Sequence, residues 1–240
     1  MGPLLAALLN LIFPPREQCP LCGRRFPGGA LCPECAGWLR ARQKEPHCCR
    51  CGRPTAGDPV CADCIGRSCP FTMVRSVGPY SGPLREAVQR FKYRGRQQLA
   101  QPLGKLMVEK ISAEPVYRQV DVVVPVPMAE AKLRRRGFNQ AHLLAQVVAA
   151  GLNKPLCTGL KKRGDTVPQI NLNRRQREEN LRGAFYLAHN VNIYQKTVLI
   201  IDDVITSGST ISAAADVLRQ GGAGAVLALT LAATPKAGGR

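Results

Sequence analysis

The chain is 240 residues long and 45% hydrophobic, and its 34 basic and 16 acidic residues give a formal charge of +18. This length and apolar content suffice for one ordinary domain with a small additional module. No apolar stretch approaches membrane-spanning length, which excludes a membrane span. The longest one near the start, residues 3–13, predicts a short packing helix in a soluble, cytoplasmic protein.

Eight cysteines in residues 1–70 form four Cys-x-x-Cys pairs, and the last four cysteines repeat the first four at an offset of 29 residues: Cys19, Cys22, Cys32, Cys35, Cys48, Cys51, Cys61 and Cys64. Gly23 and Gly52 follow the first pair of each half, where a tight metal-binding knuckle needs a small residue. Four thiolates on two knuckles suit one tetrahedral zinc ion, and segments this short and polar do not fold on apolar burial alone. The duplication therefore predicts that residues 1–70 form a module with two structural zinc ribbons.

Other uses of these cysteines stay open at this level. Disulfides are disfavoured because no secretory signal precedes them. An iron–sulfur cluster takes the same ligands, and the knuckles can pair across the two halves instead of within each. Two zinc sites of four thiolates each would lower the formal charge from +18 to +14, which leaves the basic excess in residues 71–240.

Residues 71–240 alternate apolar runs with helical periodicity, which predicts an α/β domain with a mainly parallel sheet and helices on both faces. The expected strands lie at 72–78, 121–126, 155–159, 197–201 and 224–231, and the expected helices at 84–94, 98–112, 140–150 and 209–220.

The segment 85–96 interleaves five basic residues with two aromatic ones, Phe91 and Tyr93. Basic side chains that alternate with aromatic rings are typical of single-stranded nucleic-acid binding. The alternative is an amphipathic helix whose aromatic side chains pack inward and whose basic face is merely solvated.

A basic loop is expected after the Pro-Val-Pro end of the strand at 121–126. Its cationic side chains are suited to phosphate, and arginine allows bidentate contact: Lys132, Arg134, Arg135 and Arg136. A second basic segment occupies residues 160–185.

The most informative segment is 198–210. Four apolar residues predict a strand buried on both faces, and parallel sheets bind ligands at the carboxyl ends of their strands. Asp202 and Asp203 follow, where carboxylates can accept hydrogen bonds from vicinal hydroxyls or support magnesium through its waters. A turn of hydroxyls and glycine then opens a helix, whose N-terminus favours phosphate: Thr206, Ser207, Gly208, Ser209 and Thr210.

This segment resembles the motif with which type I phosphoribosyltransferases bind phosphoribosyl pyrophosphate (PRPP). A Pro-x-Pro strand end, the Arg-Gly-Phe-Asn-Gln box at 136–140, a Thr-x-x-Gln loop and the cysteine-rich N-terminus extend the resemblance over nearly the whole chain, to the ComF family of bacterial phosphoribosyltransferase-like proteins. The resemblance implies a type I phosphoribosyltransferase-like fold and magnesium-dependent ribosyl transfer from PRPP with release of pyrophosphate. It also implies a link to DNA uptake in natural competence, and no segment identifies the ribosyl acceptor.

The resemblance implies roles for individual residues. Catalytic roles fall to Asp202, Asp203, Arg163 and Lys132, which would hold the ribose, the magnesium shell and the pyrophosphate. Substrate contacts fall to the 206–210 turn and to residues of the basic segments: Lys92, Arg134, Arg135, Arg136, Asn139, Thr166, Gln169, Arg177 and Asn180. Residues 161–182 resemble a loop that closes over the substrate and excludes water.

A second hypothesis is a DNA-handling protein in which PRPP is a regulatory ligand or the site is vestigial. Its partners would be single-stranded DNA or proteins of the competence machinery. Steep salt dependence of single-strand binding, lost on charge reversal within 85–96, would favour it. A zinc-ribbon adaptor without ribose chemistry leaves the two adjacent acids unexplained.

Overall fold

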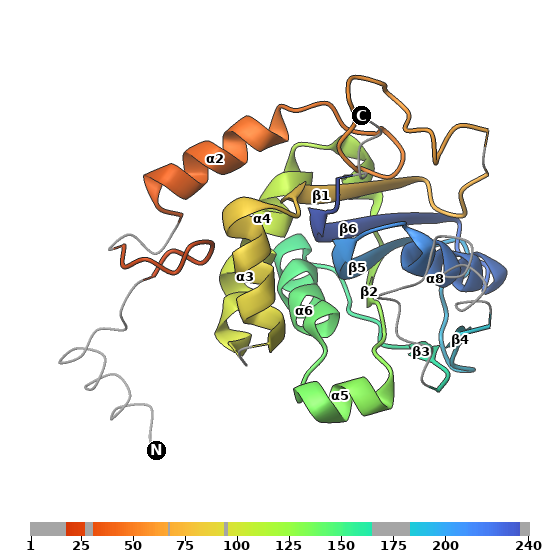
Figure 1. The fold of residues 1–240 in the computed structure, drawn as a ribbon. Helices are drawn as coiled ribbons and strands as arrows, with labels where there is room; N and C mark the ends of the chain where they lie inside the picture. Colours follow the sequence, from red (N-terminus) through yellow and green to blue (C-terminus); the bar gives the residue numbers. More distant parts are fainter. Residues whose placement is uncertain (1–17, 27–30, 67, 94–95, 165–182, 236–240) are drawn as a thin grey trace, which may run out of the picture.

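The computed structural model describes residues 18–26, 31–66, 68–93, 96–164 and 183–235. Its centre is a parallel sheet of four strands in the order β1-β6-β5-β2 (Figure 1). These strands are β1 (Met73–Pro79), β2 (Val122–Pro125), β5 (Thr197–Ile205) and β6 (Ala225–Ala233). The last strand of the chain therefore lies between the first strand and the strand that carries the two adjacent acids.

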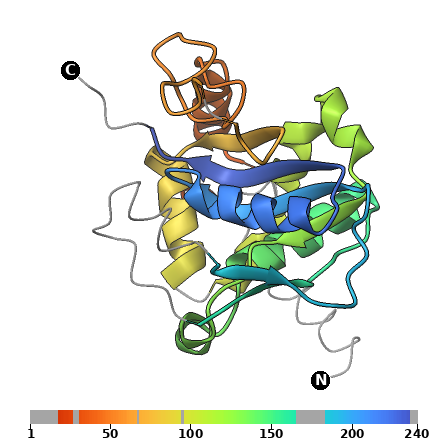
Figure 2. The same cartoon turned by 90° about the vertical axis from the view of Figure 1, so that its right-hand side faces the viewer.

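Helices cover both faces of this sheet (Figures 1 and 2). One face packs against α3 (Gly82–Tyr93), α4 (Ala100–Ser112) and α6 (Gln140–Leu152), and the other against α8 (Ser209–Gln220). Strand β5 serves both cores: Leu199 and Ile201 face the three helices, and Val198 and Ile200 face α8. The predicted α/β fold is confirmed, and within the described residues no helix is long and apolar enough to cross a membrane.

Several elements differ from the expectation. The basic loop after β2 is helical as α5 (Glu130–Arg136), because its Glu, Ala, Lys, Leu and Arg residues all favour helix and Gly137, at φ +83°, ends it. The expected strand at 155–159 contributes only a bridge between Leu156 and Val123. The chain instead forms an antiparallel pair from β3 (Leu160–Lys162) and β4 (Phe185–Leu187). Strand β5 runs on to Ile205, past both acids.

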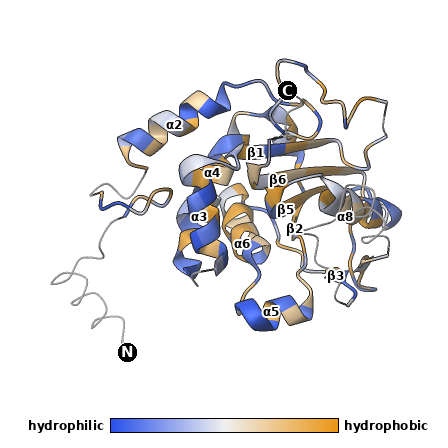
Figure 3. Ribbon diagram, in the orientation of Figure 1, coloured by the Kyte–Doolittle hydropathy of each residue, from blue (hydrophilic) through white to orange (hydrophobic). Residues whose placement is uncertain are grey.

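Short elements complete the described chain. Helix α2 (Pro33–Gln43), which the sequence analysis did not predict, begins with a proline inside the first cysteine repeat. Two 3₁₀ turns, η1 (Gln97–Leu99) and η2 (Pro115–Gln119), flank α4. Figure 3 shows that α6 and the central strands are mainly apolar, whereas α5 is largely hydrophilic.

The two cysteine repeats pack on opposite sides of the β1 edge of the sheet. The first repeat (residues 19–35) joins the core under α3, α4 and α6, and the second repeat (residues 48–64) joins the core under α8. The Val74 N–H of β1 donates a hydrogen bond to the Arg50 carbonyl oxygen at 2.7 Å. The second repeat therefore pairs with part of an edge that would otherwise expose unpaired backbone groups.

Candidate functional site

The two adjacent acids lie near the carboxyl end of β5. The Nζ atom of Lys92, from the last turn of α3, lies 2.7 Å from Oδ1 of Asp203, and both side chains are largely buried. The Asp203 N–H donates to Oδ1 of Asp202 at 2.8 Å. The fold thus brings a lysine from a distant helix onto the acidic pair, Asp202 and Asp203.

The ionisable groups around the acidic pair perturb one another. Burial, together with the charge of Asp203, raises the pKa of Asp202 to about 7. Burial disfavours the charged form of Lys92, but the charges of Asp203 and Asp202 outweigh it and raise the Lys92 pKa. Desolvation and the positive charge of Arg136 lower the pKa of Lys132, which also senses both acids. The predicted residues Lys92 and Lys132 therefore share one electrostatic environment with the acidic pair.

The 206–210 turn connects β5 to α8 directly beyond the acidic pair. Gly208, at φ +83°, is the N-cap residue of α8 and provides no side-chain cap. The Ser207 and Ser209 hydroxyls lie 2.9 Å apart, and the Ser209 N–H points at the Ser207 hydroxyl at 3.4 Å. A helix start with unpaired N–H groups and adjacent hydroxyls is suited to a phosphate.

Helix α5 carries the basic residues that follow β2. Arg136 donates to the Gln140 side-chain oxygen at 2.7 Å, and its guanidinium lies 5.1 Å from the centre of the Tyr93 ring. Arg134 pairs with Glu130 at the surface, and Arg135 is exposed. Arg136 is thus held toward α3, whereas the other two arginines face solvent.

Two predicted site residues have other partners. The Asn139 side chain caps α6: its oxygen accepts from the Ala141 N–H, and its NH₂ group donates to the Val126 carbonyl, both at 3.0 Å. Asn139 therefore shapes the backbone between β2 and α6. Arg163 lies just after β3, with its guanidinium 5.3 Å from the Tyr186 ring centre. The other predicted loop residues lie outside the described residues: Thr166, Gln169, Arg177 and Asn180.

The segment 85–96 is not a uniform nucleic-acid surface. Phe91 is fully buried against Phe138, with ring centres 5.8 Å apart, as the amphipathic alternative expects. Arg90 points inward and donates to the Pro20 carbonyl in the first cysteine repeat at 2.8 Å. Tyr93 alone of the two aromatic residues is exposed, at 73%.

Each cysteine repeat gathers its own four sulfur atoms within 4.8 Å of one another. The Cys22–Cys32 and Cys51–Cys61 sulfur pairs are 3.8 and 3.7 Å apart. A tetrahedron with Zn–S bonds of about 2.3 Å has edges of about 3.8 Å, whereas a disulfide holds sulfurs about 2 Å apart. The ligands therefore pair within each half and fit two zinc ions, and the crossed pairing does not occur.

Arg53, which the sequence analysis did not single out, joins the second cysteine repeat to the 206–210 turn. This arginine is 6% exposed, and its guanidinium donates to the Thr206 carbonyl oxygen at 3.2 Å. It also points at the sulfurs of Cys51 and Cys61, at 3.4 and 3.6 Å, and pairs with Asp63 at 2.6 Å. The duplication could have indicated Arg53 in advance, because both halves carry an arginine and an acid at matching positions. Arg24 and Glu34 stand 29 residues before Arg53 and Asp63.

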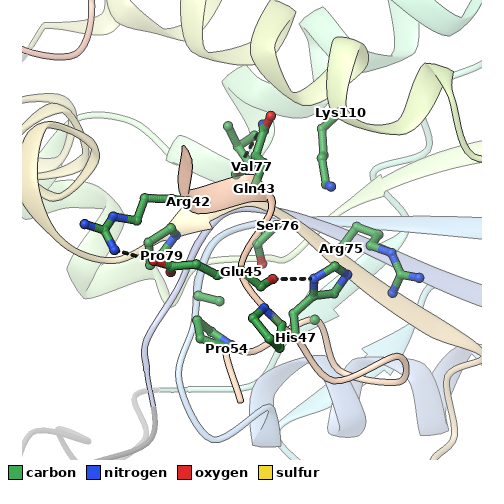
Figure 4. A pocket seen from close by; sticks show the side chains of 14 residues that line it. Arg42, Gln43, Glu45, His47, Pro54, Arg75, Ser76, Val77, Pro79 and Lys110 are labelled. Atoms are coloured by element: carbon green, nitrogen blue, oxygen red, sulfur yellow. Dashed lines mark hydrogen bonds and ion pairs between the residues drawn. The ribbon is translucent and has the colours of Figure 1, made fainter. Parts of the chain in front are cut away.

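A separate hollow lies between α2, the second cysteine repeat and β1 (Figure 4). Its lining includes His47, whose Nδ1 is 3.3 Å from the Glu45 carbonyl, and Arg75, which is paired with Glu114 at 2.8 Å. The free volume of about 30 Å³ holds one water molecule and no sugar phosphate. The hollow is a seam between the second cysteine repeat and the sheet.

Two family descriptions match the chain. "Double zinc ribbon domain" matches residues 8–65, and "Phosphoribosyl transferase domain" matches residues 96–239. Together they account for both cysteine repeats, the acidic pair and the 206–210 turn.

Several curated bacterial proteins are similar to the chain. Competence protein F of Haemophilus influenzae is 33% identical over 149 residues, which cover 60% of this chain and 65% of that protein, just under two thirds of its length. DNA utilization protein YhgH of Salmonella typhimurium is 31% identical over 87% of this chain and 86% of its own. Competence protein ComFC of Bacillus subtilis is 29% identical over 89% and 76%.

Solved structures that match the chain share little sequence with it. A glutamine PRPP amidotransferase from B. subtilis is 22% identical, with 60% of this chain and 30% of that one covered and a TM-score of 0.41. An adenine phosphoribosyltransferase from Saccharomyces cerevisiae is 19% identical, with 60% and 74% covered and a TM-score of 0.35.

Proposed function

The chain belongs to the ComF family, with a double zinc ribbon domain and a phosphoribosyl transferase domain, and on this basis we propose that it binds PRPP with Mg²⁺ at the carboxyl end of β5. The reaction that this site supports best is ribosyl transfer with release of pyrophosphate. The observation that carries the proposal is the acidic pair of β5, held beside Lys92 and followed after two intervening residues by the 206–210 turn.

Each part of PRPP would be bound by residues of suitable charge. Asp202 and Asp203 would accept hydrogen bonds from the ribose hydroxyls, and the 206–210 turn would hold the 5-phosphate with its amides and hydroxyls. Lys132 and Arg136 would bind the pyrophosphate as it leaves. The bond between C1 and the pyrophosphate oxygen breaks while an acceptor atom bonds to C1, so catalysis consists of positioning and electrostatic stabilisation.

The acidic pair also suits the cation that accompanies PRPP. Carboxylate oxygens are the donors that Mg²⁺ prefers, and Asp202 and Asp203 offer them at one strand end. Mg²⁺ bound with PRPP supplies charge neutralisation for the departing pyrophosphate. Lys92 would exchange its contact with Asp203 for one with the substrate, since its ammonium now occupies that carboxylate.

Calorimetric titration of Mg²⁺–PRPP into the zinc-replete chain tests the binding step. We expect micromolar affinity that falls at least tenfold in the Asp202→Asn, Asp203→Asn double variant, with Glu86→Gln on the exposed face of α3 as the matched control. A folded parent chain that binds no PRPP would contradict the proposal. If PRPP binds, pyrophosphate release in the presence of nucleobases or amines tests the transfer step.

The names of the relatives connect the proposal to DNA. Proteins named for competence and for DNA utilization are 29–33% identical to this chain, so we place its activity within DNA uptake. The transferred group and its acceptor would then belong to the handling of incoming DNA.

A second candidate is binding of single-stranded DNA without ribosyl transfer, with PRPP as a regulatory ligand or the site vestigial. The exposed Tyr93 ring beside Arg136, and Arg134 and Arg135 on α5, provide a stacking face next to positive charge. Binding of a labelled oligonucleotide that weakens steeply with salt, and weakens further in an Arg134→Glu, Arg135→Glu variant, would favour this candidate. PRPP binding that is unchanged in the same variant would separate the two activities and would remove Arg134 and Arg135 from the expected substrate contacts.

A further inference from the structure

Arg53 is a buried cation with three kinds of partner. Its Nε and one terminal nitrogen point at the sulfurs of Cys51 and Cys61, and the same terminal nitrogen pairs with Asp63 at 2.6 Å. The other terminal nitrogen donates to the Thr206 carbonyl at 3.2 Å. Because a guanidinium is planar and rigid, these contacts fix the positions of the metal ligands and of the 206–210 turn relative to each other.

The first cysteine repeat contains the same pair without the third partner. Arg24 and Glu34 are 29 residues before Arg53 and Asp63, and they pair at 2.6 Å. Their side chains are 70% and 72% exposed, whereas those of Arg53 and Asp63 are 7% and 24% exposed. The exposed Arg24–Glu34 pair therefore contributes little to stability. Only the pair in the second repeat is buried against the 206–210 turn.

We propose that Arg53 is a positioning residue that couples metal occupancy of the second cysteine repeat to the geometry of the 206–210 turn. The inference rests on the proposed role of that turn as the phosphate site. With the metal bound, the Cys51 and Cys61 thiolates hold the guanidinium in place, and the guanidinium holds the Thr206 carbonyl. Without the metal the knuckles lose their order, and the turn loses its buried donor.

The coupling reaches the ligand through the backbone. Thr206 is the first residue of the turn, and the amides that would face the phosphate follow it within three residues, at the start of α8. A carbonyl fixed at Thr206 therefore sets the direction of the next peptide units before any ligand arrives. This preorganisation lowers the ordering cost of phosphate binding.

Amide hydrogen exchange of residues 206–211 in the full, ligand-free chain is the first test. We expect exchange at least fivefold faster in Arg53→Ala than in the parent, and no change in Arg24→Ala, the matched variant of the first repeat. Zinc content, measured on the same samples, must stay at two ions per chain. Parent-like exchange at the turn in a zinc-replete Arg53→Ala chain would overturn the proposal.

Arg53→Lys is the second variant, for the case in which the alanine variant loses zinc or fails to fold. It keeps a positive charge beside the thiolates, but a single ammonium cannot reach both the sulfurs and the Thr206 carbonyl. We expect the Kd for Mg²⁺–PRPP to rise about five- to tenfold, within the usual range of coupling between sites. An unchanged Kd with unchanged exchange at the turn would overturn the coupling.

The parent chain offers a test that needs no variant. Coupling is reciprocal, so saturating PRPP should raise the affinity for one of the two zinc ions about fivefold, measured by equilibrium competition with a chelator, and leave the affinity for the other unchanged. Equal affinities of both ions with and without PRPP contradict the coupling. If the parent binds no PRPP, the proposed function fails, and the exchange experiment still decides whether Arg53 orders the turn.

Discussion

Asp202 holds its proton to a higher pH in the folded chain than in the unfolded one. Its pKa rises to about 7 because the carboxyl is buried and lies next to the charge of Asp203. In the unfolded chain the same carboxyl loses its proton near pH 4. The folded state therefore binds an extra proton between about pH 4 and 7, and the stability linked to that proton is lost as the pH rises through 7.

This linkage predicts a difference between the parent and Asp202→Asn. Between pH 6 and 8 the free energy of unfolding of the parent should fall by about 1 kcal/mol more than that of the variant, which has no proton to lose. Urea unfolding at constant zinc and without Mg²⁺ measures it, with Glu86→Gln as the control for an exposed carboxylate. Parallel pH profiles for parent and Asp202→Asn would contradict the assignment.

At the scale of elements, the two knuckle glycines sit in unequal surroundings. Gly23 and Gly52 have φ values of +78° and +68°, so a side chain is strained at both. A Cβ atom on Gly52 would lie 2.6 Å from the Val74 carbonyl oxygen of β1, a backbone atom that cannot move away. A Cβ atom on Gly23 would meet the end of the Arg90 side chain, which can move aside more easily than a backbone atom.

We therefore expect Gly52→Ala to cost about 3 kcal/mol of stability and Gly23→Ala about 1 kcal/mol. The difference measures how closely the second repeat approaches the β1 edge. Thermal or urea unfolding of the two variants, with zinc content checked, provides the values. Equal losses would mean that the contact between knuckle and strand is not tight.

Elements with strong local patterns could be predicted from the sequence. Helix α8 and the apolar start of β5 follow from residue spacing alone, as do the cysteine repeats. Helix α5 was missed because its charges suggested a loop, although its residue types favour helix. The strand expected at 155–159 was wrong because apolar composition does not determine whether a neighbouring strand is within reach.

From local pattern alone, the candidate site was predictable only where its residues are contiguous, and Lys92 and Lys132 were expected through the family resemblance. The acidic pair and the 206–210 turn lie in one segment, and their chemistry is visible in their order. The contact of Lys92 with Asp203, and that of Arg53 with Thr206, depend on the packing of α3 and of the second repeat against β5. No local pattern encodes such distances.

At the scale of the whole molecule, the metal sites stabilise more than their own knuckles. The first repeat extends one core and the second repeat the other, and the second repeat also pairs with the β1 edge. Loss of the metal would uncover apolar surface in both cores together with an unpaired strand edge. Such an edge promotes association between chains.

Removal of zinc with a strong chelator should therefore lower the melting temperature by roughly 10 °C or more. We expect the loss of both metal ions to lower the free energy of unfolding by at least about 3 kcal/mol, which corresponds to a shift of this order in a chain of this size. Light scattering should rise at the same time, and prompt return of zinc should reverse both changes. A metal-free chain that stays monodisperse with an unchanged melting temperature would contradict this view of the module.

The position of β6 between β1 and β5 has a consequence for the order of events during synthesis. Strand β1 pairs only with β6 in the described sheet, and β6 is synthesised after the other described strands. The cysteine repeats can capture metal while translation continues, but the strand edge on which they dock joins the sheet only once residues 225–233 are available. A nascent chain in which residues 225–233 are not yet available therefore carries a finished metal module on an unfinished domain.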